Sequence, residues 1–282
     1  MTKPIQPDTK KLEDITKQQS YFVAKRNDLI QKAGYTDKTG DSDKKDGSLS
    51  TVQSKALLYL ISKIKPNDSG EEKYYISLTD FCRVCDIDHD AGKNLSDAKR
   101  ALKAIADKSV WIRQGKNEIL LRWLDHVEWI DDQQCFEVSF TRDMIPDLYG
   151  LINQGKYIRY SLENVLPMDS KYSIHLYELL KSYEKLKPEV EFSIDELRER
   201  LDAEAYTRYP DFKRRVLETA IRDINEYSDI EVTYTPIQGK NRATEFIRFS
   251  VRCPEEMELW SRLVRRTFRK QQRIENKGER GE

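Results

Sequence analysis

The chain has 282 residues, and its 49 basic and 49 acidic side chains give a formal net charge of zero. Charged residues make up 35% of the sequence and apolar residues 38%, a composition typical of globular domains with charged surfaces and not of a membrane protein. A zero net charge argues against a protein that coats nucleic acid through bulk charge. It leaves DNA binding open, because a local basic face is enough for phosphate contacts.

Length and cysteine content set two further expectations. A chain of this length typically forms about two domains. The polar character of residues 1–20 predicts no signal peptide, and no apolar run approaches the roughly 20 residues that a membrane-spanning helix needs. Together with the four cysteines, these features predict a cytoplasmic protein with free thiols and no membrane partner.

Residues 1–47 are expected to form a flexible N-terminal arm that is partly disordered. Asp37–Gly47 consists almost wholly of charged residues, Gly, Ser and Thr, which is typical of a linker. Leu12–Ala33 carries enough apolar residues for a modest helix. We expect this arm to be peripheral to the fold, as an extension that binds a partner or forms a dimer.

The first domain is expected over residues 48–150 and combines helices with a small sheet. A helix capped by Ser50 or Thr51 ends before Pro66, because proline does not continue a helix. The further elements expected here are, in chain order, a strand at Tyr74–Leu78, a helix at Phe81–Cys85, a helix from Ser96 to about Lys108, and strands at Val110–Ile112, Ile119–Ile130 and Cys135–Phe140.

The helix that begins at Ser96 has two chemically different faces. Apolar residues recur at helical spacing and are expected to be buried. They are Ala98, Ala101, Leu102 and Ile105. The opposite face carries Lys99, Arg100 and Lys103. A turn that contains Lys116 connects the next two strands.

A second domain is expected over residues 151–255, followed by a basic C-terminal helix and tail at 256–282. Its elements are expected, in chain order, as a helix at Ser170–Lys185, a strand at Val190–Ile194, a short helix at Glu196–Leu201, a helix from Tyr209 to Tyr227, and strands at Ile230–Thr235 and Ala243–Val251. The basic run from Arg262 to Arg273 either binds phosphates or a partner, or is a solvated terminal helix.

The Tyr209–Tyr227 helix is the most informative element. Pro210 suits a first helical turn, where its missing N–H has no intrahelical partner. Its apolar face consists of Phe212, Val216, Ala220, Ile224 and Tyr227, and its opposite face carries Arg214, Arg215 and Arg222 with Glu218 and Asn225 among them. Such a helix can lie in the major groove of DNA, with its apolar side packed and its guanidinium groups on guanine edges and phosphates. The alternative is an ordinary solvated amphipathic helix.

A hairpin with a basic tip comes directly after this helix. Residues 238–242 contain Gly239, Lys240 and Arg242 and join two alternating segments. A helix followed by such a hairpin is the winged-helix pattern. Both halves of the chain show the same order of helix, short strand, helix, basic-faced helix and hairpin. The sequence therefore predicts an α+β fold of two tandem winged-helix domains.

Several stretches resemble one known family, the iteron-binding replication initiators of theta-type plasmids. The resemblance covers roughly residues 48–252 and is most specific in the second half. Its segments are Leu95–Leu102 and Phe140–Pro146 in the first half, and Ser170–Tyr172, Leu176–Leu180, Phe192–Arg198, Tyr209–Lys213, Val216–Leu217, Ala220–Ile221, Ile224–Asn225 and Ile247–Phe249 in the second.

The resemblance implies a function that periodicity and composition do not supply. Members of this family bind direct repeats in a plasmid origin as monomers, help to open adjacent AT-rich duplex, and recruit the host initiator and helicase. Dimers in equilibrium with monomers often repress the initiator's own gene. The implied partners are therefore double-stranded origin DNA, the host initiator and helicase, and a second copy of the chain.

The candidate DNA-binding residues are the cations of the two basic helices and of the hairpin tips. They are Lys99, Arg100 and Lys103 in the first domain, Arg208, Lys213, Arg214, Arg215 and Arg222 in the second, and Lys116, Lys240 and Arg242 in the wings. Two such helices in one chain are able to enter successive major grooves about 34 Å apart. Because the arginine fork bonds guanine N7 and O6 together, we expect the second domain to carry more of the sequence specificity.

Catalysis, cofactors and metals are not expected. No stretch matches the phosphate-binding pattern G-x-x-x-x-G-K-[ST], and the three His residues are isolated in sequence, which argues against a metal-dependent nicking enzyme. Cys82, Cys85 and His89 invite a zinc site, but cysteines three apart on a helix equally well form part of an apolar core. We favour the core.

Two other functions are compatible with the same residues. A winged-helix transcriptional repressor also binds specific duplex DNA, and a protein–protein adaptor uses winged helices as scaffolds. Weak salt dependence of binding would favour the adaptor. Trp111, Trp123 and Trp129 either lie in the core of the first sheet or mark an exposed face that pairs subunits.

Overall fold

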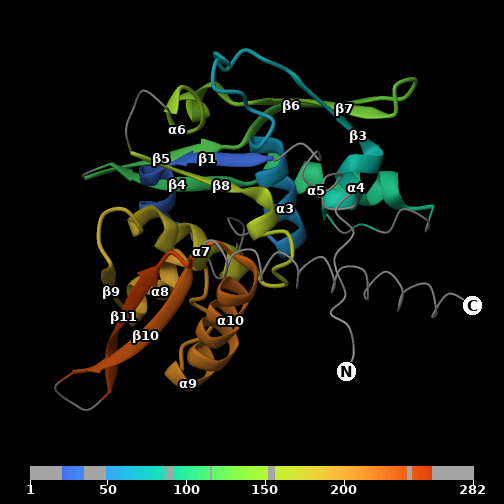
Figure 1. Cartoon of the computed structure of the whole chain (residues 1–282). Helices are drawn as coiled ribbons and strands as arrows, with labels where there is room; N and C mark the ends of the chain where they lie inside the picture. Colours follow the sequence, from blue (N-terminus) through green and yellow to red (C-terminus); the bar gives the residue numbers. More distant parts are fainter. Residues whose placement is uncertain are drawn as a thin grey trace, which may run out of the picture.

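The computed structural model describes residues 21–34, 49–85, 87, 92–114, 116–151, 156–239 and 243–255 (Figure 1). The expected C-terminal helix and tail at residues 256–282 lie outside these ranges, as do the linker at 37–47 and the start of the expected N-terminal helix. No helix in the described ranges is both long enough and apolar enough to cross a membrane.

The first half of the chain contains short helices and most of the strands. Their bounds are β1 Phe22–Arg26, α2 Asn27–Gln31, β2 Ala33–Gly34, α3 Thr51–Ile61, β3 Tyr74–Ser77, α4 Leu78–Cys85, α5 Asn94–Asp107, β4 Ser109–Gln114, β5 Asn117–Arg122, β6 Leu124–Ile130, β7 Cys135–Phe140, α6 Ile145–Leu148 and β8 Tyr157–Ser161. Ser50 begins α3 with a capping box, because its side chain accepts from the Gln53 backbone while the Gln53 side chain accepts from the Ser50 backbone.

Residues 21–34 belong to the fold, and the expected helix over Leu12–Ala33 is wrong at Phe22–Arg26, whereas Asn27–Gln31 is helical as expected. Phe22–Arg26 is a strand that pairs antiparallel with β8, and β2 pairs with β4. Val23 is fully buried, so this segment is not peripheral. Burial alternates along this segment as expected for a strand, because Val23 and Lys25 are buried while Phe22 is exposed.

The expected continuous strand Ile119–Ile130 is also corrected, since it divides at Trp123. β5 pairs with β4, whereas β6 pairs with β7, so the two parts belong to different three-stranded sheets, β2–β4–β5 and β3–β7–β6. The buried Trp123 accepts a backbone hydrogen bond from Thr141 at its carbonyl. Trp111 and Trp129 are half-buried, so one of the three tryptophans lies fully in the core.

The second half of the chain forms a helical layer against a three-stranded sheet. Its elements are α7 Lys171–Tyr183, β9 Glu189–Ser193, α8 Ile194–Arg200, α9 Tyr209–Phe212, a π-helical segment Lys213–Leu217, α10 Glu218–Tyr227, β10 Glu231–Gln238 and β11 Thr244–Arg252. The Ser170 side chain caps α7, and Ser193 caps α8. The strands are ordered β10–β11–β9, and the β10–β11 hairpin projects away from the rest of the molecule (Figure 1).

One hydrophobic core joins the two halves, and α7 lies where they meet. This helix packs against α2 and α3 on one side and against α10 on the other. Buried polar contacts reinforce the junction. Lys25 of β1 donates to Glu178 of α7 at 2.9 Å, and the Tyr160 hydroxyl donates to the same carboxylate at 2.6 Å. Arg113 of β4 forms an ion pair with Glu199 of α8.

Candidate nucleic-acid interface

Helix α5 places the three predicted cations of the first half on one exposed side. Ala98, Leu102 and Ile105 are almost fully buried, as their spacing predicts. The exposed cations each have a neighbour within the chain: Arg100 lies 3.1 Å from Asp97, Lys103 pairs with Asp107, and Lys99 lies 5.7 Å from the centre of the Trp129 ring. Exposed pairs of this kind contribute little to stability, so phosphates can replace the carboxylates.

The first wing is the β4–β5 hairpin, which comes directly after α5. Its strands pair from Ser109↔Arg122 to Gln114↔Asn117, and the exposed Lys116 lies in the turn between them. The structure therefore places Lys116 at the tip of a hairpin that follows a basic-faced helix in sequence.

A single long helix runs from Tyr209 to Tyr227, and we refer to it as the reading helix. It contains α9, the π-helical segment and α10 in direct succession. Within it the Glu218 N–H donates to the Lys213 carbonyl, one residue farther back than in an α-helix. A π-helical turn contains one residue more than an α-helical turn. Val216 and Leu217 are both in the core at 0% exposure, where a regular helical period predicts Val216 alone.

The reading helix carries its predicted cations on the outside. Arg208, which precedes it, and Arg214, Arg215 and Arg222 are exposed, and Lys213 is half-exposed. Most of their ion pairs are loose: Arg208 and Arg214 lie 3.9 Å and 3.7 Å from Asp211, and Lys213 lies 3.7 Å from Glu218. Arg215 has no ion pair with any residue that the structure describes. Long, exposed pairs leave these side chains available to an anionic partner.

The helical spacing predicts Asn225 on the exposed face with Arg214, Arg215 and Arg222, but in the structure its side chain is bound to the wing. Its side-chain amide donates to the Val232 carbonyl at 2.9 Å and accepts from the Val232 N–H at 2.7 Å. Val232 lies in β10, the first strand of the second wing. Asn225 therefore fixes the angle between the reading helix and the wing.

The second wing is a regular antiparallel hairpin up to its tip. β10 and β11 pair from Glu231↔Arg252 to Gln238↔Thr244, with an irregularity between Ile237 and Gln238. The predicted tip residues Lys240 and Arg242 lie outside the described residues. Their place in the interface stays a prediction.

Two buried polar residues beside the reading helix have no distinct sequence signal. Asp223 is 3% exposed although it lies in a helix whose other charged residues face outward. It accepts from the fully buried Ser173 hydroxyl of α7 at 2.7 Å and from the Arg222 guanidinium at 3.0 Å. The only hint in the sequence is a carboxylate next to the apolar position Ile224.

The cysteines proposed for zinc lie inside the core of the first half. Cys82 and Cys85 are both 0% exposed on α4, and His89 lies outside the described residues. Burial raises the pKa of both thiols, which opposes formation of the thiolate that a metal requires.

A second polar cluster has ligand-type atoms but also a competing cation. Ligand atoms of His126, Glu128 and Glu137 lie within 4.8 Å of one another on the β6–β7 sheet. Glu137 already accepts from Lys73 at 2.5 Å and from the Tyr75 hydroxyl at 2.6 Å, and these hydrogen bonds lower the pKa of its carboxyl group. Because an ammonium group already neutralises this carboxylate, the cluster is best described as a paired surface network.

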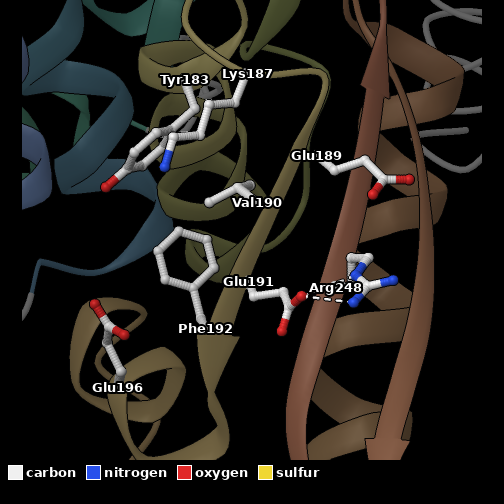
Figure 2. Close-up of a pocket in the computed structure, with 8 residues that line it drawn as sticks. All are labelled: Tyr183, Lys187, Glu189, Val190, Glu191, Phe192, Glu196 and Arg248. Carbon is white, nitrogen blue, oxygen red and sulfur yellow. Dashed lines mark hydrogen bonds and ion pairs between the residues drawn. The ribbon is translucent and has the colours of Figure 1, made fainter.

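A hollow in the second half lies beside β9 and has the wrong charge for DNA. Its volume is about 570 Å³. Figure 2 shows Tyr183 and Phe192 on its apolar side and an ion pair between Glu191 and Arg248 across β9 and β11. Glu189 and the other carboxylates of its lining outnumber the cations, so the hollow would repel phosphate. The cationic surface of the reading helix is a separate feature.

Comparison with known proteins gives two family-model matches. A model described as "Initiator Replication protein, WH1" matches residues 22–181, and a model described as "Initiator Rep protein, WH2" matches residues 193–251. The first match begins at β1, in keeping with the pairing of that strand with β8. The predicted fold of two tandem winged-helix domains is confirmed.

Individual relatives agree with these models. A replication initiation protein of Escherichia coli is 28% identical over 173 residues, which cover 58% of this chain, and the PI protein of Escherichia coli is 32% identical over 151 residues, which cover 47%. The chain spans about half the length of these relatives, 52% and 50%. The crystal structure of the Pi initiator protein in complex with iteron DNA matches with a TM-score of 0.63 and 20% identity, over 85% of this chain and 100% of that chain. The chain thus belongs to the family of plasmid replication initiators with a first and a second winged-helix domain.

Proposed function

We propose that this protein initiates plasmid replication by binding direct repeats in the plasmid origin through both winged-helix domains. The observation that carries the proposal is the pair of exposed basic helices, α5 and the reading helix, each followed by a hairpin. A likeness of fold to an initiator whose structure was solved with iteron DNA supports it. The family shared with replication initiation proteins supports the same role.

The electrostatics of the two helices suit a duplex partner. Cations on α5 and on the reading helix are exposed, and those of the reading helix other than Arg222 have only long ion pairs or none among the described residues. Each phosphate that such a cation neutralises releases counterions, so binding should weaken steeply as salt rises. A zero net charge limits unspecific attraction elsewhere on the surface.

Binding leads, in the proposed scheme, to duplex opening and to recruitment of host proteins. Binding energy strains the adjacent AT-rich duplex, since flexible base steps are the least costly to deform. The bound protein then recruits the host initiator and helicase in the cytoplasm. A dimeric form in equilibrium with the monomer represses the initiator's own gene. In this scheme the protein acts by binding and not by catalysis.

A plasmid that depends on this gene tests the proposal. The gene and its flanking DNA are placed on a plasmid without another origin, and transformants are counted. We expect the wild-type gene to support replication and the double variant Arg214→Ala, Arg215→Ala to abolish it. The control variant Arg83→Ala changes an exposed cation of α4, outside both basic helices, and should replicate normally.

The same plasmid separates initiation from simple repression. Permanganate footprinting of supercoiled plasmid detects unpaired thymines beside the repeats. We expect protein-dependent reactivity in the AT-rich segment. Specific binding without replication and without unpaired thymines would identify a repressor instead.

A further inference from the structure

The reading helix holds one of its arginines in a way that differs from the others. Arg208 and Arg214 lie 3.9 Å and 3.7 Å from Asp211, too far for a hydrogen bond, and Arg215 has no ion pair among the described residues. Arg222 is hydrogen-bonded to Asp223 through two nitrogens, Nη2 at 3.0 Å and Nε at 3.3 Å. Arg222 is therefore hydrogen-bonded within the chain, whereas Arg208, Arg214 and Arg215 are not held in this way.

The Asp223 carboxylate that binds Arg222 also accepts a hydrogen bond from a neighbouring helix. Asp223 is 3% exposed, and both nitrogens of Arg222 donate to its Oδ1. Its Oδ2 accepts from the hydroxyl of Ser173, at 2.7 Å in the first turn of α7. The two oxygens therefore have different partners, one on each side. The buried Ser173 ties the carboxylate to the helix that packs against the reading helix.

The free edge of the guanidinium is the one that guanine requires. The Asp223 carboxylate occupies the Nε edge of Arg222, and the Nη1–Nη2 edge keeps its outward hydrogens. The Arg222 side chain is 67% exposed, and its hydrogen bonds among the described residues all go to Asp223 through Nε and Nη2. Guanine presents N7 and O6 as two adjacent acceptors in the major groove, which a forked donor bonds together.

We propose that Asp223 is a positioning residue that presents the outer edge of Arg222 to a guanine in the major groove. The inference rests on the proposed function, because it takes the reading helix to lie in that groove. Arg222 loses its rotational freedom in the free protein, before DNA arrives, so the base contact is pre-organised. The loosely held Arg215 has no such constraint and is suited to the phosphate backbone.

The salt dependence of DNA binding distinguishes the base contact proposed for Arg222 from the phosphate contact proposed for Arg215. Arg222 is assigned to a base and not to a phosphate, so Arg222→Ala should leave the salt dependence of DNA binding nearly unchanged and should reduce base discrimination. Removing Arg215 should instead lower the slope of log affinity against log salt by about one. Arg215→Ala is therefore the matched control for Arg222→Ala.

The test measures binding of the full chain to a duplex that the wild-type protein selects from a random library. Copies of this duplex carry 7-deazaguanine, which lacks N7, at one guanine at a time. We expect wild-type binding to weaken about tenfold at one guanine, and this penalty to vanish in Arg222→Ala. Asp223→Asn should reduce it to about threefold. A full penalty in Asp223→Asn overturns the proposal.

A measurement on the unmodified protein covers the case in which Asp223→Asn does not fold. Nitrogen-15 relaxation of the arginine Nε–H groups, without DNA, should show Arg222 ordered and Arg215 mobile. Equal mobility of the two side chains overturns the proposal. This result does not depend on the DNA role of the helix. If the wild-type protein selects no duplex, or if Arg215→Ala and Arg214→Ala bind as the wild type does, the proposed function fails instead.

Discussion

Asn225 shows how one side chain sets the geometry of a domain. Both hydrogen bonds of its amide go to the backbone of Val232, so the amide takes the place of a strand partner for that residue. We expect Asn225→Ala to lower the free energy of unfolding by about 1–3 kcal/mol, because it leaves a buried N–H and C=O of Val232 without this partner. Urea denaturation measures the change.

Asn225→Asp is the matched variant for this prediction. It keeps the acceptor for the Val232 N–H but removes the donor to the Val232 carbonyl. Its free energy of unfolding should lie between the values of the wild type and Asn225→Ala. An alanine variant as stable as the wild type would show that the two hydrogen bonds between Asn225 and Val232 contribute nothing to stability.

Glu178 is the second residue whose loss should be costly. It is 5% exposed and accepts from Lys25 and from the Tyr160 hydroxyl. Glu178→Gln leaves the buried Lys25 ammonium without a counter-charge, and we expect a loss of about 3–5 kcal/mol in the free energy of unfolding. The double variant Lys25→Met, Glu178→Gln should recover much of this loss, since it removes the orphaned charge. A double variant no more stable than the single one would rule out that explanation.

At the scale of elements, the two basic helices should differ in what they contribute to DNA binding. The cations of α5 are two lysines and one arginine, whereas arginines dominate the reading helix. We expect alanine at Lys99, Arg100 and Lys103 to weaken binding to target and random duplex alike, with a shallower salt slope. Alanine at Arg214 and Arg222 should lower the ratio between target and random duplex. Titrations over a salt series measure both, and equal ratios in the two variants would contradict the assignment.

The sequence predicts helices better than strands, for physical reasons visible in particular elements. Helices α7 and α10 show apolar residues at a constant period, which local spacing reveals. β1 is five residues long, and its partner β8 lies far along the chain, so only the tertiary pairing identifies it as a strand. The break at Trp123 depends in the same way on which strand pairs with which.

The candidate site was predictable to a similar degree. The exposed cations of both helices agree with the helical period. The π-helical segment does not, because it changes that period by one residue between Phe212 and Glu218. Asp223 and Asn225 look like ordinary surface residues in the sequence. Their roles depend on contacts with α7 and β10, which local spacing does not encode.

At the scale of the whole molecule, the junction between the halves contains a group that links stability to pH. His175 lies in α7, and burial lowers its pKa from 6.5 to about 4, although the carboxylates of Glu178 and Asp202 oppose the shift. As the pH falls from about 7 to 4, the unfolded chain binds a proton at this residue and the folded chain does not, so folding loses about 3 kcal/mol. Urea denaturation at several pH values should show a shallower decline in His175→Gln than in the wild type. Parallel curves would contradict this assignment.

The central claim is that one chain contacts two successive major grooves through α5 and the reading helix. Dimethyl sulfate methylates guanine N7 in the major groove, so protection from it reports this contact directly. On a duplex selected by the wild-type protein, we predict two groups of protected guanines on one face, about 34 Å apart. Alanine at Lys99, Arg100 and Lys103 should remove one group, and alanine at Arg214 and Arg215 the other. A single protected group, or two groups that both variants affect alike, would contradict the account.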